Sequence, residues 1–390
     1  MKIKKTLIVA VILLHLFFYV SALKTHTFDY FFPWGNVHDH QGIDFYQVPN
    51  GARMFMQGGN LTGESISSIN TYAYGNRNVY HPFFTLLVGT PLQLLTPQTA
   101  FTLWLVFHGC LWFFLAWYLY QKFKSNKNIT LALVLFLGLF PHYLEIWNGQ
   151  YHFLYNAAIF FLLLASLQQE KWQDGLAFVS SLLVKPISLL FIPALILRKR
   201  WKTLLLGLSL FAVTTIFFIL NRSGMYYLNN LFDRVSHPIG GPPGIFTLDA
   251  VLRFLAVPLY NTTLTKVVVA LGIVFVSWRL RLNLFVQLFL WTSFYLLFYD
   301  LVFEYHYTTL APFLAIGILT QKALQTRIAK VLSLTYVLPT PFFLFHLWQF
   351  QAVGQSVTDA GWVILVLFRI LPLMILDYVV IFRSRSTYAL

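Results

Sequence analysis

The chain is a series of long apolar stretches separated by short polar connections, without the period-2 alternation of a transmembrane β-barrel. The apolar runs cover about residues 6–23, 82–95, 101–120, 129–145, 153–168, 175–197, 203–220, 264–278, 283–303, 307–320, 329–350 and 361–382. Because hydrocarbon offers no partner to exposed backbone polar groups, each run is predicted to be helical. Most are long enough to cross a core of roughly 30 Å. The predicted fold class is an all-α polytopic membrane protein.

The predicted protein is one integral membrane domain over residues 1–390, with about 12 transmembrane helices in a range of about 10 to 13. Hydrophobic residues make up 58% of the chain and aromatic residues 18%, which excludes a water-soluble globule. The first run follows a basic head and ends in "VSA", so a cleaved signal peptide is the alternative to a first span. Similar runs recur to the end of the chain and favour the span.

The net charge of +14 raises the question of a nucleic-acid partner. The basic residues, however, cluster in gaps between apolar runs, at 2–5, 198–202, 279–281, 322–330 and 383–385. This pattern is typical of cytoplasmic loops that retain Lys and Arg during insertion. We therefore expect no nucleic-acid partner, a multi-pass protein of the cell membrane, and both termini on the cytoplasmic side.

One basic segment does not fit the simplest topology. With twelve crossings, "QKFKSNKN" at 121–128 falls on the outer face, against the positive-inside rule. If 82–95 and 175–197 are re-entrant instead, 121–128 falls inside and "NGQYHF" at 148–153 moves outside. Both arrangements keep the long polar segments outside.

Two of those polar segments are long enough to have structure of their own. The first outer loop, 24–81, exceeds a simple connector and is predicted to be a folded cap, with a short interfacial helix around Ala52 to Met56. The second outer loop, 221–263, contains a rigid "HPIGGPPG" turn, and its "FTLDAVLRFLAVPLY" stretch is predicted to form an amphipathic interfacial helix.

The first outer loop holds an unusual density of ionisable groups in "NVHDHQGIDFYQ", residues 36–47. A carboxylate such as Asp44 at the mouth of a membrane bundle can act as a general base toward a hydroxyl. The alternative is that Asp44 caps the following helix or is simply solvated. A divalent metal on His38, Asp39, His40 and Asp44 is a further alternative, but no DxD pair is present and we predict no metal.

Two other positions call for a chemical explanation. Tyr80 and His81 precede Pro82, which suits a first helical turn. Lys185 lies in the middle of "LLVKPISLL", where a charge facing lipid costs on the order of 3 kcal/mol. It is predicted to bind phosphate in a polar cavity, to pair with a carbonyl freed by Pro186, or to snorkel from a half-helix toward the interface. The polar residues of "NGQYHF" are typical of hydrogen bonding between helices.

Five segments in order resemble the polyprenyl-phosphate-dependent glycosyltransferases of the GT-C superfamily, most closely glycosyltransferase family 87, which includes mycobacterial mannosyltransferases acting on phosphatidylinositol mannosides. They are "GIDFYQ" with the later "GGN", "VYHPFFTLL", "NGQYHFLYNAAIFFLLLA", "DGLAFVSSLLVKPISLLFIPALILRKRW" and "FEYHYTTLAPFL". They cover residues 1 to roughly 320. The chain departs from the family pattern at Phe83, where a second proline is usual, and at His152, where Asn is common.

The resemblance implies a GT-C-type bundle and a set of site residues. Asp44 would deprotonate the acceptor hydroxyl, and His306 would face the donor phosphate, with Glu304 holding its ring. Further candidates for binding the donor phosphate or the substrate are Lys185, Tyr46, Tyr80, His81, Arg222, Arg234 and His237.

The implied activity is inverting transfer of one sugar, mannose or another hexose or pentose, from a polyprenyl phosphate to a lipid- or glycan-linked acceptor on the outer face. Neither a metal nor a cofactor is expected, because the leaving group is already a phosphodiester with delocalised charge. A lipid or sugar transporter is the alternative from another class, but repeated halves are expected there and none is evident. A polysaccharide polymerase or ligase would also have large outer loops.

Overall fold

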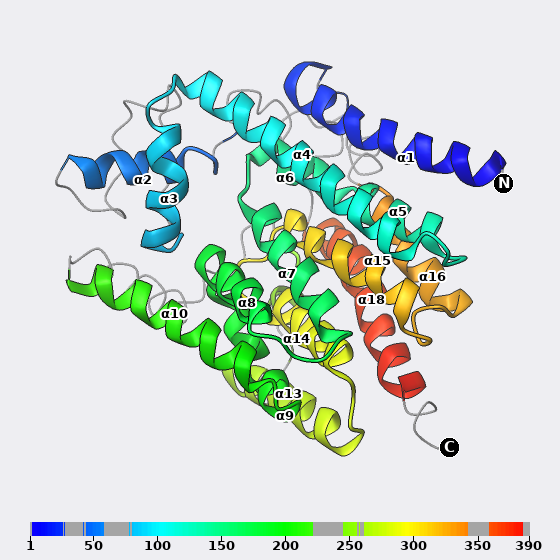
Figure 1. The fold of residues 1–390 in the computed structure, drawn as a ribbon. Coiled ribbons are helices and arrows are strands. Elements are labelled where there is room, and N and C mark those ends of the chain that lie inside the picture. Colours follow the sequence, from blue (N-terminus) through cyan, green and yellow to red (C-terminus); the bar gives the residue numbers. More distant parts are fainter. Residues whose placement is uncertain are drawn as a thin grey trace.

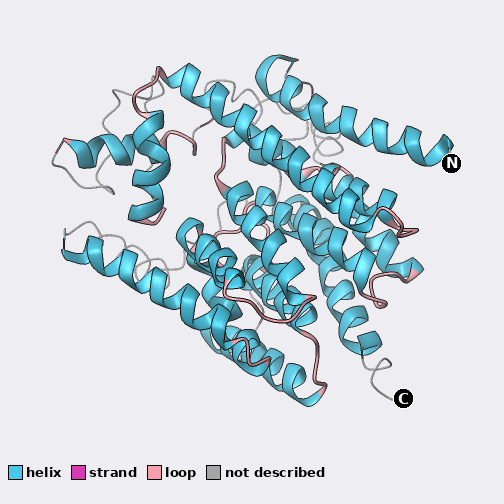
Figure 2. Ribbon diagram, in the orientation of Figure 1, coloured by secondary structure: helices cyan, strands magenta, loops and turns pink. Residues whose placement is uncertain are grey.

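A computed structural model describes residues 2–25, 27, 42, 44–57, 78, 80–220, 245–255, 257, 261–341 and 359–384. Within these residues the chain is helical, with no strand (Figures 1 and 2). The helices are α1 (Lys2–Val20), η1 (Ser21–Thr25), α2 (Gln47–Met56), α3 (Pro82–Leu92), α4 (Pro97–Phe123), α5 (Ile129–Leu137), α6 (Pro141–Asn148), α7 (His152–Ser166), α8 (Gln173–Val184), η4 (Pro186–Phe191), α9 (Ile192–Leu197), α10 (Trp201–Leu220), α12 (Leu248–Phe254), α13 (Thr262–Arg279), α14 (Leu284–Phe298), η5 (Glu304–Thr309), α15 (Leu310–Thr320), α16 (Arg327–Leu334), η6 (Thr335–Val337) and α18 (Asp359–Ser384).

Every predicted apolar run contains helix, which confirms the all-α multi-pass class. Among the described residues, six helical segments are long and apolar enough to cross a membrane by themselves: Lys5–Thr25, Pro97–Phe123, Ile129–Asn148, Trp201–Phe218, Thr262–Arg279 and Val363–Arg383. Other runs form shorter apolar helices, such as α7 and α14. The short helix predicted in the first outer loop is part of α2, and the one in the second is α12.

Basic segments gather at one end of the bundle, which we call the basic end. Arg200 donates to the carbonyl of Gln168 at 2.7 Å, and Arg198 donates to the carbonyl of Leu282. Lys330 Nζ donates to Asn128 Oδ1 at 3.1 Å. Residues 121–128, whose side was ambiguous, therefore lie with the other basic loops.

The run at 175–197 does not cross the bundle. It breaks at Lys185 and Pro186 into α8, then η4 and α9, because proline lacks the N–H that a continuous helix needs and biases the preceding residue away from helix. Both ends of this segment lie at the basic end, where Arg200 contacts the chain just before α8. The segment is re-entrant, with Lys185 at its apex.

The run at 82–95 also stays at one end. Helix α3 packs along α2, with Gly89 so close to Val48 that an added Cβ would lie 2.5 Å from its carbonyl oxygen. Figure 1 shows α2 and α3 together at the end of the bundle remote from the N-terminus. The arrangement with two re-entrant segments is thus the one that the structure matches. Residues 148–153 accordingly lie opposite the basic end.

The interior is built around α14 and α15, which are buried on all sides, as expected of helices that are apolar all round. Helix α13 lies at the periphery and exposes Leu264, Val268 and Leu271, as a helix facing lipid does. This packing leaves the turn α6–α7, the apex at Lys185 and the short helix η5 close together at the end opposite the basic end.

Candidate functional site

A short segment of the first loop is fixed onto the turn between α6 and α7. The backbone N–H of Gly42 donates to the carbonyl of Trp147 at 2.9 Å, and that of Asp44 donates to the carbonyl of Asn148 at 3.1 Å. These two bonds run between segments more than 100 residues apart in the sequence. They hold the Asp44 backbone against the turn.

The turn accepts the segment because it is compact. Gly149 ends α6 with φ of +65°, a conformation that only glycine adopts without strain. A Cβ at this position would lie 2.7 Å from Phe45 Cβ and 2.7 Å from the Phe101 ring. Tyr151 then donates its hydroxyl to the carbonyl of Phe45 at 2.9 Å. Any larger residue at 149 would push the Asp44 segment off the turn.

Two amides bind the Asp44 carboxylate, and a phenol holds one of these amides. Gln47 Nε2 donates to Oδ1 at 2.7 Å, and Gln150 Nε2 donates to Oδ2. Tyr80 donates its hydroxyl to Gln150 Oε1 at 3.2 Å, which fixes the orientation of that amide. Asp44 does not cap α2: the N-cap residue is Tyr46, without a side-chain bond. The carboxylate is therefore oriented by side chains, and the capping interpretation is wrong.

The Asp44 side chain lies partly open to solvent. Burial of the carboxyl raises its pKa to about 6, while nearby Lys185 and the two amide hydrogen bonds act in the opposite direction. A carboxylate with a pKa near 6 is a better proton acceptor than an ordinary aspartate and is still ionised at neutral pH. These properties suit a general base.

If Asp44 is the base, activity should follow its ionisation. We expect kcat/KM to fall about tenfold per pH unit below about 6 and to level off above it, since only the deprotonated carboxylate accepts a proton. A pH profile of initial rates measures this. Gln150→Leu removes a bond that favours the ionised form, so its acid limb should move to higher pH. A profile that is flat from pH 4.5 to 8 would count against Asp44.

Lys185 places a cation beside this carboxylate. Its backbone is extended at the break between α8 and η4, and its side chain is half-buried. The Nζ atom lies 5.7 Å from the centroid of the Tyr305 ring, within range of a cation–π contact. Lys185 also acts electrostatically on both Asp44 and His306. The re-entrant segment thus brings positive charge into the site.

His306 presents a neutral imidazole. Its Nδ1 accepts from the backbone N–H of Phe303 at 2.9 Å, so in the neutral ring the proton is on Nε2. The ring lies 4.3 Å from the Tyr305 ring and 5.1 Å from the His152 ring, centroid to centroid. Burial lowers the pKa of His306 well below its usual value, and Lys185 lowers it further. The local positive charge therefore comes from Lys185, and His306 offers a hydrogen-bond donor.

Two predicted site residues face other elements. His81 caps α3 by accepting from the backbone N–H of Phe83 at 3.2 Å, and its Nε2 lies 3.0 Å from Thr215 Oγ1 on α10. Tyr46 is buried with its ring 6.2 Å from that of Phe101 on α4. Both residues connect elements around the site. Their part in substrate binding stays a prediction.

Glu304 does not hold the His306 ring, which was the prediction. Its Oε1 accepts from Arg369 Nη2 at 2.5 Å and from Thr340 Oγ1. The ring is held instead at Nδ1, which accepts from the backbone N–H of Phe303. The remaining predicted residues lie outside the described residues: His38, Asp39, His40, Arg222, Arg234 and His237.

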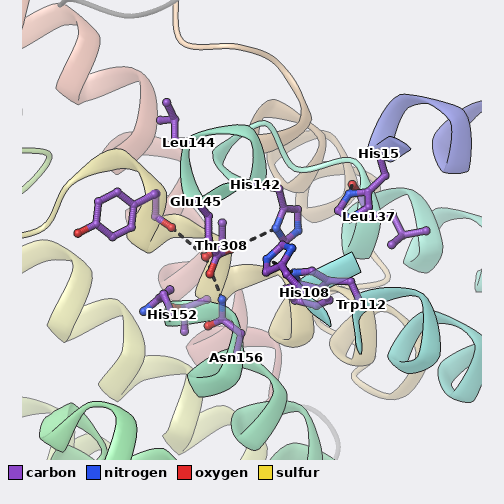
Figure 3. A network of polar contacts seen from close by, with 12 residues as sticks. His15, His108, Trp112, Leu137, His142, Leu144, Glu145, His152, Asn156 and Thr308 are labelled. Atoms are coloured by element: carbon purple, nitrogen blue, oxygen red, sulfur yellow. Dashed lines mark hydrogen bonds and ion pairs between the residues drawn. The ribbon is translucent and has the colours of Figure 1, made fainter. Parts of the chain in front are cut away.

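A buried polar network adjoins the site (Figure 3). Asn156 Nδ2 donates to Thr308 Oγ1 at 2.9 Å, and His152 Nε2 lies 2.6 Å from Thr309 Oγ1, so α7 is tied to η5 as hydrogen bonding between helices predicts. Glu145 is buried, with Oε2 3.5 Å from His142 Nδ1. The network supports η5 on the side that faces α7.

Gln150 and Tyr305 are the residues that sequence reasoning missed. Gln150 was interpreted as an inter-helix contact, yet it binds Asp44 and Tyr80. Tyr305 was passed over although it directly precedes His306, and its ring contacts both Lys185 and His306. Their place in the "NGQYHF" and "FEYH" segments was the only available signal.

Comparison with known proteins gives one family. The model of glycosyltransferase family 87 matches residues 78–299. The match includes Tyr80, Gln150 and Lys185, while Asp44 and His306 lie on either side of it. No curated protein and no solved structure matches the chain.

Proposed function

Because the chain belongs to glycosyltransferase family 87 and is a multi-pass membrane glycosyltransferase, we propose that it transfers one sugar from a polyprenyl phosphate to a lipid- or glycan-linked acceptor. The observation that carries this proposal is the arrangement of three residues at one end of the bundle: Lys185 and His306 both lie against the Tyr305 ring, and Gln150 holds Asp44 on the adjoining α6–α7 turn. A base, a cation and a neutral hydrogen-bond donor are the groups that transfer from a phosphate-linked sugar needs.

The proposed step is a single displacement at C1 of the sugar. The acceptor oxygen bonds to C1 while the bond from C1 to the phosphate oxygen breaks, and the electron pair stays on the polyprenyl phosphate. Asp44 accepts the hydroxyl proton and returns it to solvent, to which it is partly open. Attack opposite the leaving group inverts C1, as in the one-step logic of inverting glycosidases.

Lys185 and His306 act on the leaving group. The Lys185 cation offsets charge that builds on the phosphate as the bond breaks, and the Nε2–H of His306 donates to a phosphate oxygen. Both are held in place before the substrate binds, Lys185 by the break after α8 and His306 by the Phe303 N–H. Neither role requires a metal or a cofactor, and the proposal includes none.

A cavity of about 710 Å³ supports a lipid-linked donor. It runs between α3, α4, α7 and α8, and its lining is mostly apolar, with small residues such as Ala157, Ala158 and Ala177. At one end it is lined by Val184, which precedes Lys185, and by Phe84, whose ring packs against Tyr80 at 5.6 Å. A prenyl chain in this groove places its phosphate beside Lys185.

The proposed orientation follows from charge. If the basic end faces the cytoplasm, as the positive-inside rule predicts, the site opens on the outer face of the cell membrane. Both termini are then cytoplasmic. The acceptor reaches Asp44 from the water side, and the donor enters from the lipid side.

The test is turnover by the purified protein in lipid nanodiscs. We expect transfer from long-chain polyprenyl-phosphate sugars, mannose first, and none from nucleotide sugars. Ala177→Trp, which fills the groove at a half-buried position, should raise the KM for a long-chain donor about tenfold and leave that for a short, geranyl-length donor unchanged.

The matched control is Gly272→Trp on α13, where an added side chain meets open space. It should leave both KM values as they are. Turnover of nucleotide sugars instead, or movement of a sugar lipid without any bond cleavage, would overturn the proposal. If Ala177→Trp raised the KM for short and long donors equally, the groove would not be the binding site of the prenyl chain.

A further inference from the structure

The shortest ion pair among the described residues is buried, and it lies beside the proposed site but not in it. Arg369 of α18 is fully buried. Its Nε and Nη2 atoms both donate to Glu304 Oε1, at 2.9 and 2.5 Å. Thr340 donates to the same oxygen. A guanidinium on an apolar helix is costly unless its charge is matched, and here the match is to one carboxylate.

Arg369 also fixes the chain around that carboxylate. Its Nη1 donates to the carbonyl of Thr335 at 3.3 Å and its Nη2 to that of Leu338 at 3.0 Å. The Tyr336 hydroxyl returns a bond to the carbonyl of Arg369 at 2.8 Å. One side chain thus joins α18, the η6 segment and the first residue of η5.

The ion pair acts on the site through η5. Glu304 is the first residue of η5, and Tyr305 and His306 follow directly. A 3-10 helix is tight and bonded from residue i to residue i+3, so a shift of its first residue also shifts the two that follow. The Tyr305 ring lies against Lys185 Nζ and the His306 ring, and His306 is the residue proposed to donate to the phosphate.

We propose that Arg369 is a positioning residue, which by holding Glu304 fixes the turn that presents His306 to the donor phosphate. This inference rests on the proposed function only for the role of His306. It gives α18 a role in positioning the site, although α18 lies outside the residues that the family model matches.

The test is a double-mutant cycle between the ion pair and His306. Glu304→Gln with Arg369→Met removes both charges together and leaves no buried ion unmatched. The readout is the dissociation constant of farnesyl phosphate, together with kcat/KM for transfer. In the native background, His306→Ala should weaken binding about tenfold, as expected for a hydrogen bond to a charged group. In the double-variant background it should change binding less than twofold.

A second variant and a control keep the test decisive. Arg369→Lys retains charge but not the two-atom grip on Oε1, and should give an intermediate loss. Asp377→Asn alters another polar contact of α18, the part-buried hydrogen bond from Ser293, and should leave the effect of His306→Ala at its native size. Thermal unfolding midpoints of all variants show whether each is folded.

A tenfold effect of His306→Ala that persists in the double variant would overturn the inference, and so would native-like binding by the Arg369→Lys and double variants alike. If the native protein binds farnesyl phosphate but transfers no sugar, the proposed function fails while the cycle on binding still decides the role of Arg369.

Discussion

Asp44→Asn is expected to lower kcat by about 10²- to 10⁴-fold, the range that a positioned general base contributes. Asparagine keeps the shape of the side chain and can still accept the bond from Gln47, but it cannot take the acceptor's proton. Donor binding should change little, because Lys185 and His306 bind the phosphate in the proposal. Single-turnover transfer with saturating donor measures the effect.

Glu170→Gln is the matched control, since it removes a carboxylate at the basic end of the bundle and its amide oxygen can still accept from the Thr203 N–H. It should leave kcat at its native value. An Asp44→Asn protein that is folded and keeps full turnover would exclude Asp44 as the base. A loss of kcat together with a large fall in the thermal unfolding midpoint would point to a structural role instead.

Lys185→Gln is expected to lower kcat/KM by about 10²-fold, because a cation that acts on both Asp44 and His306 is lost. A second effect has a definite sign. Lys185 holds the pKa of Asp44 down, so without it that pKa rises above about 6 and the acid limb of the pH profile moves to higher pH. Steady-state rates from pH 5 to 9 report both changes.

Lys322→Gln, at the basic end, is the control and should alter neither the rate nor the profile. Lys185→Arg should recover part of the rate, since the charge is restored with different geometry. If Lys185→Gln lowers the rate without moving the acid limb, then Lys185 and Asp44 do not interact in the working enzyme. A single site made of Asp44, Lys185 and His306 would then be excluded.

Two of the candidate site residues could be predicted from the composition of the sequence around them. A lysine inside an apolar run and an aspartate in a dense polar loop stand out because their surroundings make charge costly or unusual. His306 was found through resemblance rather than physics. In the structure, Lys185 Nζ lies 5.7 Å from the centroid of the Tyr305 ring, and that ring lies 4.3 Å from the His306 ring.

The partners of individual side chains could not be predicted. The Tyr46 ring lies near Phe101 of α4, and His81 lies 3.0 Å from Thr215 of α10, neither of which the sequence indicates. Glu304 was matched with its neighbour His306, whereas its partner is Arg369, 65 residues away. Short sequence distance suggests a contact, but in a bundle the partner is whichever helix packs against that face.

The sequence by itself determined the class of protein, the helical runs and the segregation of basic residues, because these follow from burying backbone and charge in hydrocarbon. Only the tertiary structure decided that the segments 82–95 and 175–197 are re-entrant. It also decided that Gln150 orients Asp44 and that Arg369 binds Glu304, the first residue of η5. Each of these depends on which side chains meet across the bundle, and such long-range pairings leave no periodic trace in the chain.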